Sequence, residues 1–437
     1  MGDVMVLDSH QNCRSKLDTV ACCERRLRSQ ALEKRTRREA KRQGLPISGL
    51  LARYLSATHD RFGYFCKAPA KRFARWQWLM ESNLVRIPDI RIFSYKDLHH
   101  ATQCFAPRNW LGEGQHGRVY QGRLAMPPDR QLQAVAIKRF KPTTADPIYR
   151  ILAELRVDKA FAKHSPSRPN DLRQLLGVCF HISGPLLVYE FVPNGTLRQH
   201  LRRDPRSSPV MGSAMVRLSI AIDVAHALCE LHYGFSLPIY YRNLKSSKIL
   251  IESDLHAKLA DFGDAVIVKT DSDLLTPVAI GTIGYKDPVY EKTCWAGDKT
   301  DVYSFGVILM ELATHLPAWD PKRHTPLLAD LVIARMRGNR GSGADREDTD
   351  TVEKIIHPGT VHGGMTLMKD LLYLAVQCCR LDLSRRPRID EVHAALLQVQ
   401  LQSIELLLLC SGDELTTDLP PTSPIPSSPP YTAPWKP

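Results

Sequence analysis

Apolar and polar residues form short runs from about Phe93 onward, and longer stretches between these runs carry apolar residues at helical spacing. The run at 118–124 alternates and the run at 134–137 is apolar throughout, and both are typical of strands. The segment 302–312 is apolar nearly all round, which predicts a buried central helix. A further helix is predicted where apolar residues recur every three or four positions, at Leu218, Ala221, Ile222, Ala225 and Leu228.

Polar segments interrupt and follow this region. Residues 337–350 are charged and contain glycine, which predicts a surface loop. After Cys410 the composition changes, and eight prolines lie between Pro420 and Pro437 among serines and threonines. This composition predicts a disordered Pro/Ser/Thr-rich tail at 411–437 that packs against nothing.

The positive charge is concentrated before the mixed region. The 437 residues carry a net charge of +13, of which +9 falls in residues 1–90. Residues 25–42 alone carry +7 and are rich in helix formers, which predicts a basic helix. A solvated charged face is the commonest role of such a helix, and an anionic membrane surface or nuclear import are sharper alternatives. Nucleic acid is the least favoured partner, because no stacking aromatic residues accompany the charge.

Cysteines and apolar runs indicate the compartment. The 11 cysteines include no CxxC pair, which favours a reducing cytoplasm. No apolar run reaches the 18 residues of a membrane-spanning helix, and the start lacks the apolar core of a signal peptide. We therefore expect a cytoplasmic protein that is soluble or peripheral at the plasma membrane, with nuclear residence as the alternative. Acylation of Cys22-Cys23 beside the basic helix would provide a membrane anchor.

A glycine-rich motif, Leu111-Gly112-Glu113-Gly114-Gln115-His116-Gly117, is followed by Val119. The same glycines occur in dinucleotide-binding turns, but there a helix follows them. Here a strand follows, which predicts a hairpin that folds over phosphates. Lys138 ends the next strand and could pair with phosphate oxygens if Glu154, in the helical stretch 149–160, holds it in place.

Three later motifs complete an ordered set. They are Tyr241-Arg242-Asn243-Leu244-Lys245 with Lys248, Asp261-Phe262-Gly263, and Asp287-Pro288 before Asp301. Together with the glycine motif they resemble a eukaryotic protein kinase domain. The resemblance implies an α+β, bilobal fold at 93–403, with a β-rich N-lobe at 93–192 and a mainly helical C-lobe at 193–403. Residues 1–92 would form a basic N-terminal extension similar to the segment that lies just inside the membrane in receptor kinases.

The kinase-like region is most similar to plant receptor-like kinases of the wall-associated group. Pro185 to Phe191 and Pro238 to Arg242 carry this similarity, as does the stretch from Phe93 to Thr102. The transmembrane helix and ectodomain of that group are absent from the sequence, which suggests a cytoplasmic or truncated relative.

The family resemblance assigns ATP and Mg²⁺ as cofactors. It implies that Asp261 binds Mg²⁺, that Lys245 contacts the transferred phosphate, and that Thr276 and Thr282 lie in the activation segment. It places ATP against Leu111, Gly112, Glu113, Gly114, Gln115, His116, Gly117, Val119, Ala136, Lys138, Glu154, Glu190 and Val192.

Two positions depart from the family pattern in the catalytic loop. Asn243 stands where the family has the Asp that accepts the substrate proton, and an amide cannot be that base. Lys248 stands where the family has the Asn that binds a second Mg²⁺, and an ammonium has no lone pair to offer. These changes suggest one bound ion at most.

Other departures are milder. Tyr241 replaces a His and could still pack beneath Asp261, while Val289 replaces the Glu that pairs with the arginine at Arg386. A buried arginine without its carboxylate is costly, so Arg386 must find another partner or reach water, and the substrate-docking loop would be looser.

Three functions remain open. The favoured one is a catalytically impaired, ATP-binding pseudokinase that acts as a scaffold or allosteric partner of other signalling proteins, such as an active receptor-like kinase. The alternatives are an active serine/threonine kinase of reduced turnover and a basic nuclear adaptor.

Overall fold

A computed structural model describes residues 90–412 of the protein, apart from 127–130, 142–146, 165–168, 182–183, 205–206, 339–351 and 358–363. These residues belong to one of the two compact units into which the chain divides, Phe73–Pro437. The basic segment at 25–42, the Cys22-Cys23 pair and the Pro-rich stretch after residue 412 lie outside the described residues, as does most of the loop expected at 337–350. The interpretations given to them stay predictions.

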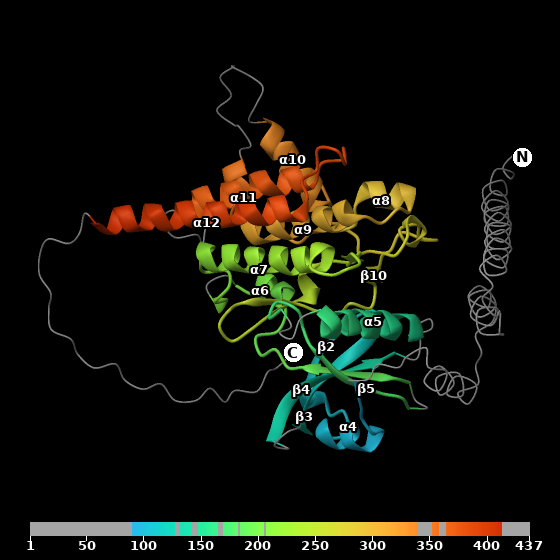
Figure 1. Ribbon diagram of the computed structural model, residues 1–437. Coiled ribbons are helices and arrows are strands. Elements are labelled where there is room, and N and C mark those ends of the chain that lie inside the picture. The colour runs from blue at the N-terminus through green and yellow to red at the C-terminus, as the bar shows by residue number, and fades with distance from the viewer. Residues whose placement is uncertain are drawn as a thin grey trace, which may run out of the picture. The chain divides into compact units, whose positions relative to one another are not determined.

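A six-stranded sheet in the order β1-β5-β6-β4-β3-β2 forms the N-lobe (Figure 1). Its neighbours pair antiparallel, except for β1 with β5. Pairing of β2 with β3 across the glycine-rich turn confirms the predicted hairpin. The strands are β1 (Arg91–Ile92), β2 (Trp110–Glu113), β3 (Gly117–Met126), β4 (Gln131–Phe140), β5 (Leu175–Cys179) and β6 (Leu186–Glu190).

Both faces of the sheet are covered. Successive side chains of a strand point to opposite faces, so β6 packs Leu186 and Val188 into one apolar cluster and Leu187 and Tyr189 into another. The first cluster lies under α4 (Tyr95–Ala101), and the second contains apolar residues of α5 (Ile148–His164). The packing therefore places β4 and α5 next to each other. The predicted pairing of Lys138 in β4 with Glu154 in α5 requires this arrangement.

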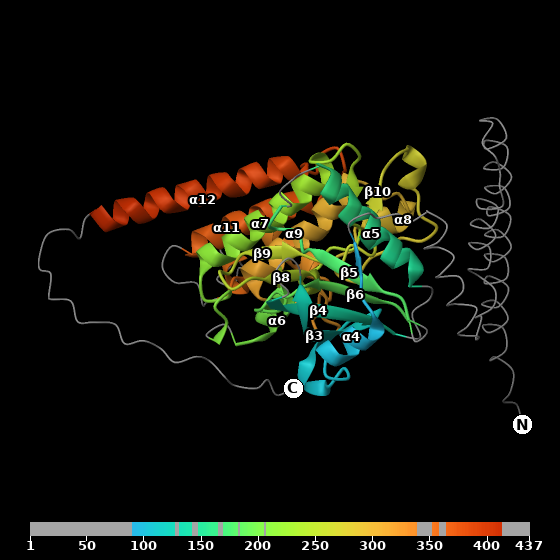
Figure 2. The same ribbon diagram turned by 60° about the horizontal axis from the view of Figure 1, so that its bottom comes forward.

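Helices form the C-lobe, as expected. Every residue of α9 from Thr300 to Thr314 is buried, which confirms the helix predicted at 302–312. The helix predicted from the spacing at 218–228 is α7, which packs against α12, and α12 extends beyond its neighbours to Gly412 (Figure 2). None of the helices in the described part of the chain has an apolar stretch long enough for a bilayer. The helices are α6 (Leu197–Arg202), α7 (Ala214–Tyr233), α8 (Pro288–Thr293), α9 (Asp298–Thr314), α10 (Leu328–Gly338), α11 (Gly364–Cys378) and α12 (Ile389–Gly412).

Two small ribbons carry the loops that meet the N-lobe. β7 (Ile239–Tyr240) pairs with β10 (Val266–Ile267), and β8 (Ile249–Ile251) pairs with β9 (Ala257–Leu259). Residues 241–248 connect β7 to β8, and residues 260–265 connect β9 to β10. Each ribbon therefore joins one end of the 241–248 loop to one end of the loop that contains Asp261.

Buried acids of α9 anchor this region. The two carboxylate oxygens of Asp301 accept the backbone N–H groups of Tyr241 and Arg242, each at 2.7 Å. Glu311 accepts the hydroxyl of Tyr285 at 2.7 Å, and that hydroxyl lies 2.9 Å from the Ser246 hydroxyl. Burial raises the pKa of Glu311 to about 7. The central helix thus fixes the position of the 241–248 loop and ties it to the segment around Tyr285.

Candidate nucleotide and phosphoryl-transfer site

The glycine-rich turn keeps its backbone open. A side chain at Gly117 would press against β4, because its Cβ would lie 2.6 Å from the Arg139 carbonyl oxygen. Among the described residues other than the chain neighbours, no atom lies within 4 Å of a Cβ built on Gly112, and the nearest to one on Gly114 is 3.9 Å away. The N–H of Gly114 donates to the Gly117 carbonyl at 2.9 Å, which closes the turn. The turn can therefore come close to a phosphate chain, as its sequence predicts.

Charged side chains of the turn pair with each other and with β4. Glu113 binds Arg118 at 2.8 Å and Lys141 at 2.5 Å, which keeps its pKa below the usual range. His116 is half-buried, and this burial together with the nearby charge of Arg150 lowers its pKa to about 4. Leu111 and Gln115 are exposed, and Val119 is half-buried. At physiological pH the imidazole of His116 is thus neutral, and the carboxylate of Glu113 is ionised and paired with two cations.

Lys138 lies between two acids from different lobes. Its Nζ is 2.6 Å from Oδ1 of Asp261 and 4.0 Å from Oε1 of Glu154. Glu154 also accepts the Tyr189 hydroxyl at 3.0 Å, and burial raises its pKa to about 7. The structure therefore brings Lys138, Glu154 and Asp261 together as the sequence predicts, with Asp261 as the nearer acid.

The other residues that the resemblance assigns to the nucleotide lie on β4 and at or just after the end of β6. Ala136 and Val192 are buried there. The carboxylate of Glu190 is held by Lys258 at 2.9 Å and by the Gln174 N–H at 2.7 Å, so this acid is already paired. Ala136 and Val192 fit a contact with a planar base, whereas Glu190 serves the local structure.

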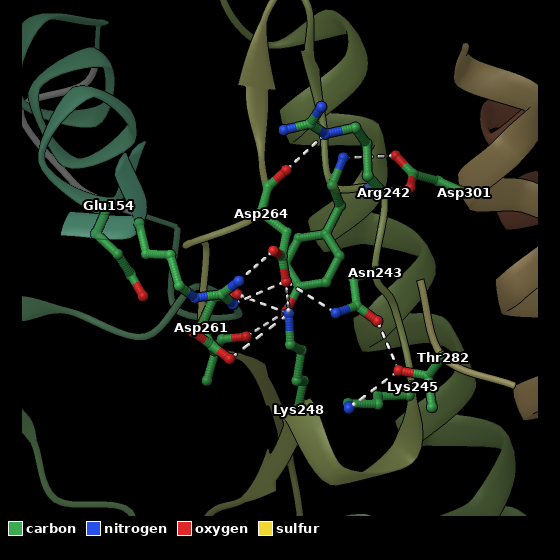
Figure 3. Close-up of polar contacts among 12 residues, drawn as sticks. Glu154, Arg242, Asn243, Lys245, Lys248, Asp261, Asp264, Thr282 and Asp301 are labelled. Carbon is green, nitrogen blue, oxygen red and sulfur yellow. Dashed lines mark hydrogen bonds and ion pairs between the residues drawn. The ribbon is translucent and has the colours of Figure 1, made fainter. Parts of the chain in front are cut away.

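Asn243 is held at both ends of its amide (Figure 3). Its Nδ2 donates to Oδ2 of Asp264 at 2.8 Å, and its Oδ1 accepts the Thr282 hydroxyl at 2.8 Å. The Thr282 oxygen in turn accepts the ammonium of Lys245 at 3.1 Å. Burial and the charge of Lys248 lower the pKa of Lys245 to about 8. The residue at the position of the family's base is thus a neutral amide, and both ends of it are already hydrogen-bonded, to Asp264 and to Thr282.

Lys248 points into the site from the end of the same loop (Figure 3). Its buried ammonium lies 3.2 Å from Oδ2 of Asp264, 3.2 Å from the carbonyl oxygen of Asp261 and 3.6 Å from Oδ2 of Asp261. The ring of Tyr241 lies 5.0 Å below it, and the Tyr241 hydroxyl donates to the Ala260 carbonyl. Lys248 therefore occupies the space between two carboxylates, and Tyr241 supports it as a packing residue.

Asp264 is the site residue that the sequence analysis missed. Besides Asn243 and Lys248, it binds the guanidinium of Arg150 from α5 through both of its oxygens. Burial alone would raise its pKa, but Lys248 and Arg150 outweigh this effect and hold the pKa far below its usual range. An acid directly after Asp261-Phe262-Gly263 is the signal that could have found it. Asp264 joins α5, the 241–248 loop and the Asp261 loop in one network.

Burial and positive charge act against each other at Asp261. Burial would raise the pKa of this carboxyl, but Lys138, Lys248 and Arg150 outweigh it and hold the pKa well below the usual range. Asp261 therefore stays ionised, and each of its two carboxylate oxygens faces a lysine.

Arg386 is fully buried and has a carboxylate partner despite the loss of the family Glu at Val289. Its guanidinium binds Asp287 at 2.6 and 3.1 Å and donates to two backbone carbonyls, of Lys299 and Arg380. Asp287 also caps α8, because it accepts the N–H of Val289 at 3.0 Å. Arg386 has therefore found another partner, as expected from the loss of the Glu at Val289, and that partner is Asp287.

The threonines expected in the activation segment differ in access. Thr276 is buried, and its hydroxyl donates to the Cys294 carbonyl at 3.1 Å and lies 3.1 Å from the Tyr290 hydroxyl. Thr282 is half-buried against Asn243 and Lys245. Thr270 and Ser272 are exposed. Modification of Thr276 would require this segment to open, whereas Thr270 and Ser272 are accessible as they stand.

The residues fit ATP better than a pair of metal ions. The open glycine turn and Lys138 suit a phosphate chain. Mg²⁺ requires several oxygen ligands in near-octahedral geometry. Of the two positions at which the family binds metal, 261 offers a carboxylate and 248 offers an ammonium, which has no lone pair. An ion between positions 261 and 248 would also meet the ammonium of Lys248, so the donors at this place do not fit one.

Comparison with known proteins places these features in a family. Residues 106–396 match the family model described as protein tyrosine and serine/threonine kinase, whose members in general use ATP and Mg²⁺. The chain is 36% identical over 315 residues to wall-associated receptor kinase-like 14 of Arabidopsis thaliana and 35% identical over 320 residues to wall-associated receptor kinase-like 21. Each match covers 71% of this chain but only 41% and 48% of the respective relative. The chain therefore spans less than half the length of these relatives.

Proposed function

The chain belongs to the protein tyrosine and serine/threonine kinase family, among relatives of the plant wall-associated receptor kinases, and we propose that it is a catalytically impaired, ATP-binding pseudokinase. It would act by engaging other signalling proteins, an active receptor-like kinase among them. The basic N-terminal segment would hold it near an anionic membrane surface.

The state of Asn243 is the observation that carries this proposal. Phosphoryl transfer depends on positioning and charge neutralisation, with a carboxylate accepting the proton of the substrate hydroxyl. The amide oxygen of Asn243 already accepts a hydrogen bond from Thr282, and the amide nitrogen is a donor to Asp264. No change of side-chain rotation turns this group into a base. Loss of an acid-base group typically lowers a rate by about 10² to 10⁴-fold.

Asp264 does not replace the missing base. Its carboxylate is the nearest one to Asn243, but Arg150, Lys248 and Asn243 all donate to it. Lys248 and Arg150 lower the pKa of Asp264, so the carboxylate has little tendency to take a proton. The acid near the base position thus serves the structure of the site.

The nucleotide half of the site supports ATP binding. When bound, ATP would supply the phosphate chain, over which the glycine turn would lie and with which Lys138 would pair. Glu154 and Asp261 hold Lys138 beneath that turn. A kinase fold that binds nucleotide without transferring phosphate can switch between states that partners distinguish.

One observation favours the alternative of an active kinase of reduced turnover. The lowered pKa of Lys245, about 8, leaves part of its amine neutral near pH 7 to 8, and it lies 3.1 Å from Thr282. A neutral amine at this place could accept a proton in place of Asn243.

ATP binding is tested by thermal unfolding of the full chain with increasing ATP. Saturation at about a hundred times Kd adds roughly 2.7 kcal/mol to the free energy of unfolding, which raises the melting temperature measurably. The Lys138→Met variant should lose most of this rise, measured against its own melting temperature without ATP, and circular dichroism should show that it is folded. Lys286→Met, which removes a surface lysine paired with Glu291, is the matched control and should keep the full rise. Absence of any rise in the wild type at millimolar ATP contradicts the proposal.

A further inference from the structure

Two ammonium groups cover the carboxylate of Asp261. Lys138 lies 2.6 Å from Oδ1, and Lys248 lies 3.6 Å from Oδ2 and 3.2 Å from the backbone carbonyl oxygen of the same residue. Lys248 is buried, and Asp264 holds it in place at 3.2 Å. The family's metal-binding carboxylate is therefore already paired with positive charge in this chain.

The side chains around Lys248 offer a metal ion few free oxygens. Asp264 is bound through both oxygens by Arg150 and accepts Asn243 and Lys248 as well. Lys248 itself has three donors and no acceptor. A divalent cation at this place would have to displace an ammonium that two acids hold, and it would gain no ligand from position 248 in return.

The two catalytic-loop departures also make the charge of the site more positive by two units. An Asn in place of the family's Asp at 243 adds one positive charge, and a Lys in place of the family's Asn at 248 adds another. Their sum of +2 equals the charge of one Mg²⁺. Metal-free ATP carries two more negative charges than its complex with one Mg²⁺, so the protein itself supplies the charge that the ion would bring.

We propose that this chain binds ATP without a divalent cation, with the ammonium of Lys248 taking the place of the ion at the phosphate chain. The proposal rests on the nucleotide binding proposed above and deepens it. Lys138 and Lys248 pair with different oxygens of Asp261, and each ammonium has three donors, so both can also donate to phosphate oxygens beside this carboxylate. ATP binding then does not depend on the concentration of Mg²⁺.

The test is calorimetric titration of the full chain with ATP, once in EDTA and once in millimolar Mg²⁺. We expect the two Kd values to agree within about threefold, a difference below 1 kcal/mol. Lys248→Asn should weaken ATP binding in EDTA by about tenfold, as expected for loss of one charge-assisted contact. Addition of Mg²⁺ should then recover affinity in this variant. Lys248→Arg keeps the charge and should keep binding in EDTA, and Lys286→Asn is the surface control that should match the wild type.

Each outcome separates this inference from the proposed function. Binding of ATP by the wild type in Mg²⁺ but not in EDTA overturns the inference and leaves nucleotide binding intact. Equal affinity of the wild type and Lys248→Asn in EDTA also overturns it, provided that circular dichroism shows both proteins folded. Lack of binding in both buffers overturns nucleotide binding and the inference together.

Discussion

Replacement of Asp287 by alanine is expected to destabilise the protein by about 3–5 kcal/mol, the cost of leaving a buried charge without its partner. Arg386 has no exposed side-chain surface and binds Asp287 through two nitrogens, so the variant cannot hydrate the guanidinium without opening the lobe. The same change removes the cap of α8, which adds roughly 1 kcal/mol. Urea unfolding of the wild type and the variant measures the difference.

A second substitution tests whether Arg386 is the cause. Val289→Glu restores the acid that the family pattern places beside this arginine, so it should recover part of the stability lost in Asp287→Ala. In the wild-type background it should add little, because Arg386 already has a carboxylate. Asp287→Asn keeps an oxygen for the cap and should cost less than Asp287→Ala. Equal stability of Asp287→Ala and the wild type would show that Asp287 does not neutralise Arg386.

Recovery of phosphoryl transfer is expected to require three substitutions. Asn243→Asp with Lys248→Asn restores the family's base and metal ligand. However, it places a carboxylate where Nδ2 of Asn243 now lies 2.8 Å from Asp264, and two such carboxylates cannot both stay ionised. Asp264→Asn removes this conflict, because its amide can donate to the new carboxylate and still accept from Arg150. We expect the triple variant to exceed the wild type by about 10² to 10⁴-fold in transfer.

The measurement is transfer of labelled phosphate from Mg²⁺ and ATP to a generic protein acceptor. The double variant should gain far less than the triple variant, because groups that act as one unit are not additive. Lys138→Met added to the triple variant should abolish the gain and thereby show that it arises in this site. A double variant as active as the triple one would mean that Asp264 does not oppose a base at position 243.

Local patterns were sufficient to predict single elements of the fold, and the resemblance to protein kinases predicted the arrangement in two lobes. The apolar segment 302–312 predicted α9, because a helix that is apolar all round has to be buried. The glycine spacing and the strand that ends at Lys138 predicted the hairpin of β2 and β3. These predictions succeeded because each depends on residues close together in the chain.

Contacts between distant residues account for what the sequence did not predict. Asp264 and Arg150 are 114 positions apart, and Asp287 and Arg386 are 99 positions apart. Side-chain spacing carries no sign of such pairs. From Val289 we could predict that Arg386 needs a new partner, but not that Asp287 is this partner. From Asn243 and Lys248 we could predict the loss of a base and of a metal ligand, but not that Asp264 binds both residues.

The most direct test of the central claim is phosphoryl transfer by the wild-type protein, compared with Lys138→Met under the same conditions. Purified full chain is incubated with labelled ATP, Mg²⁺ and a generic acceptor, and label is counted on the acceptor and on the chain itself. The account predicts that the wild type and Lys138→Met are indistinguishable, although only the wild type binds ATP well. Incorporation by the wild type well above the Lys138→Met level would contradict it and would make the protein an active kinase with an unconventional base.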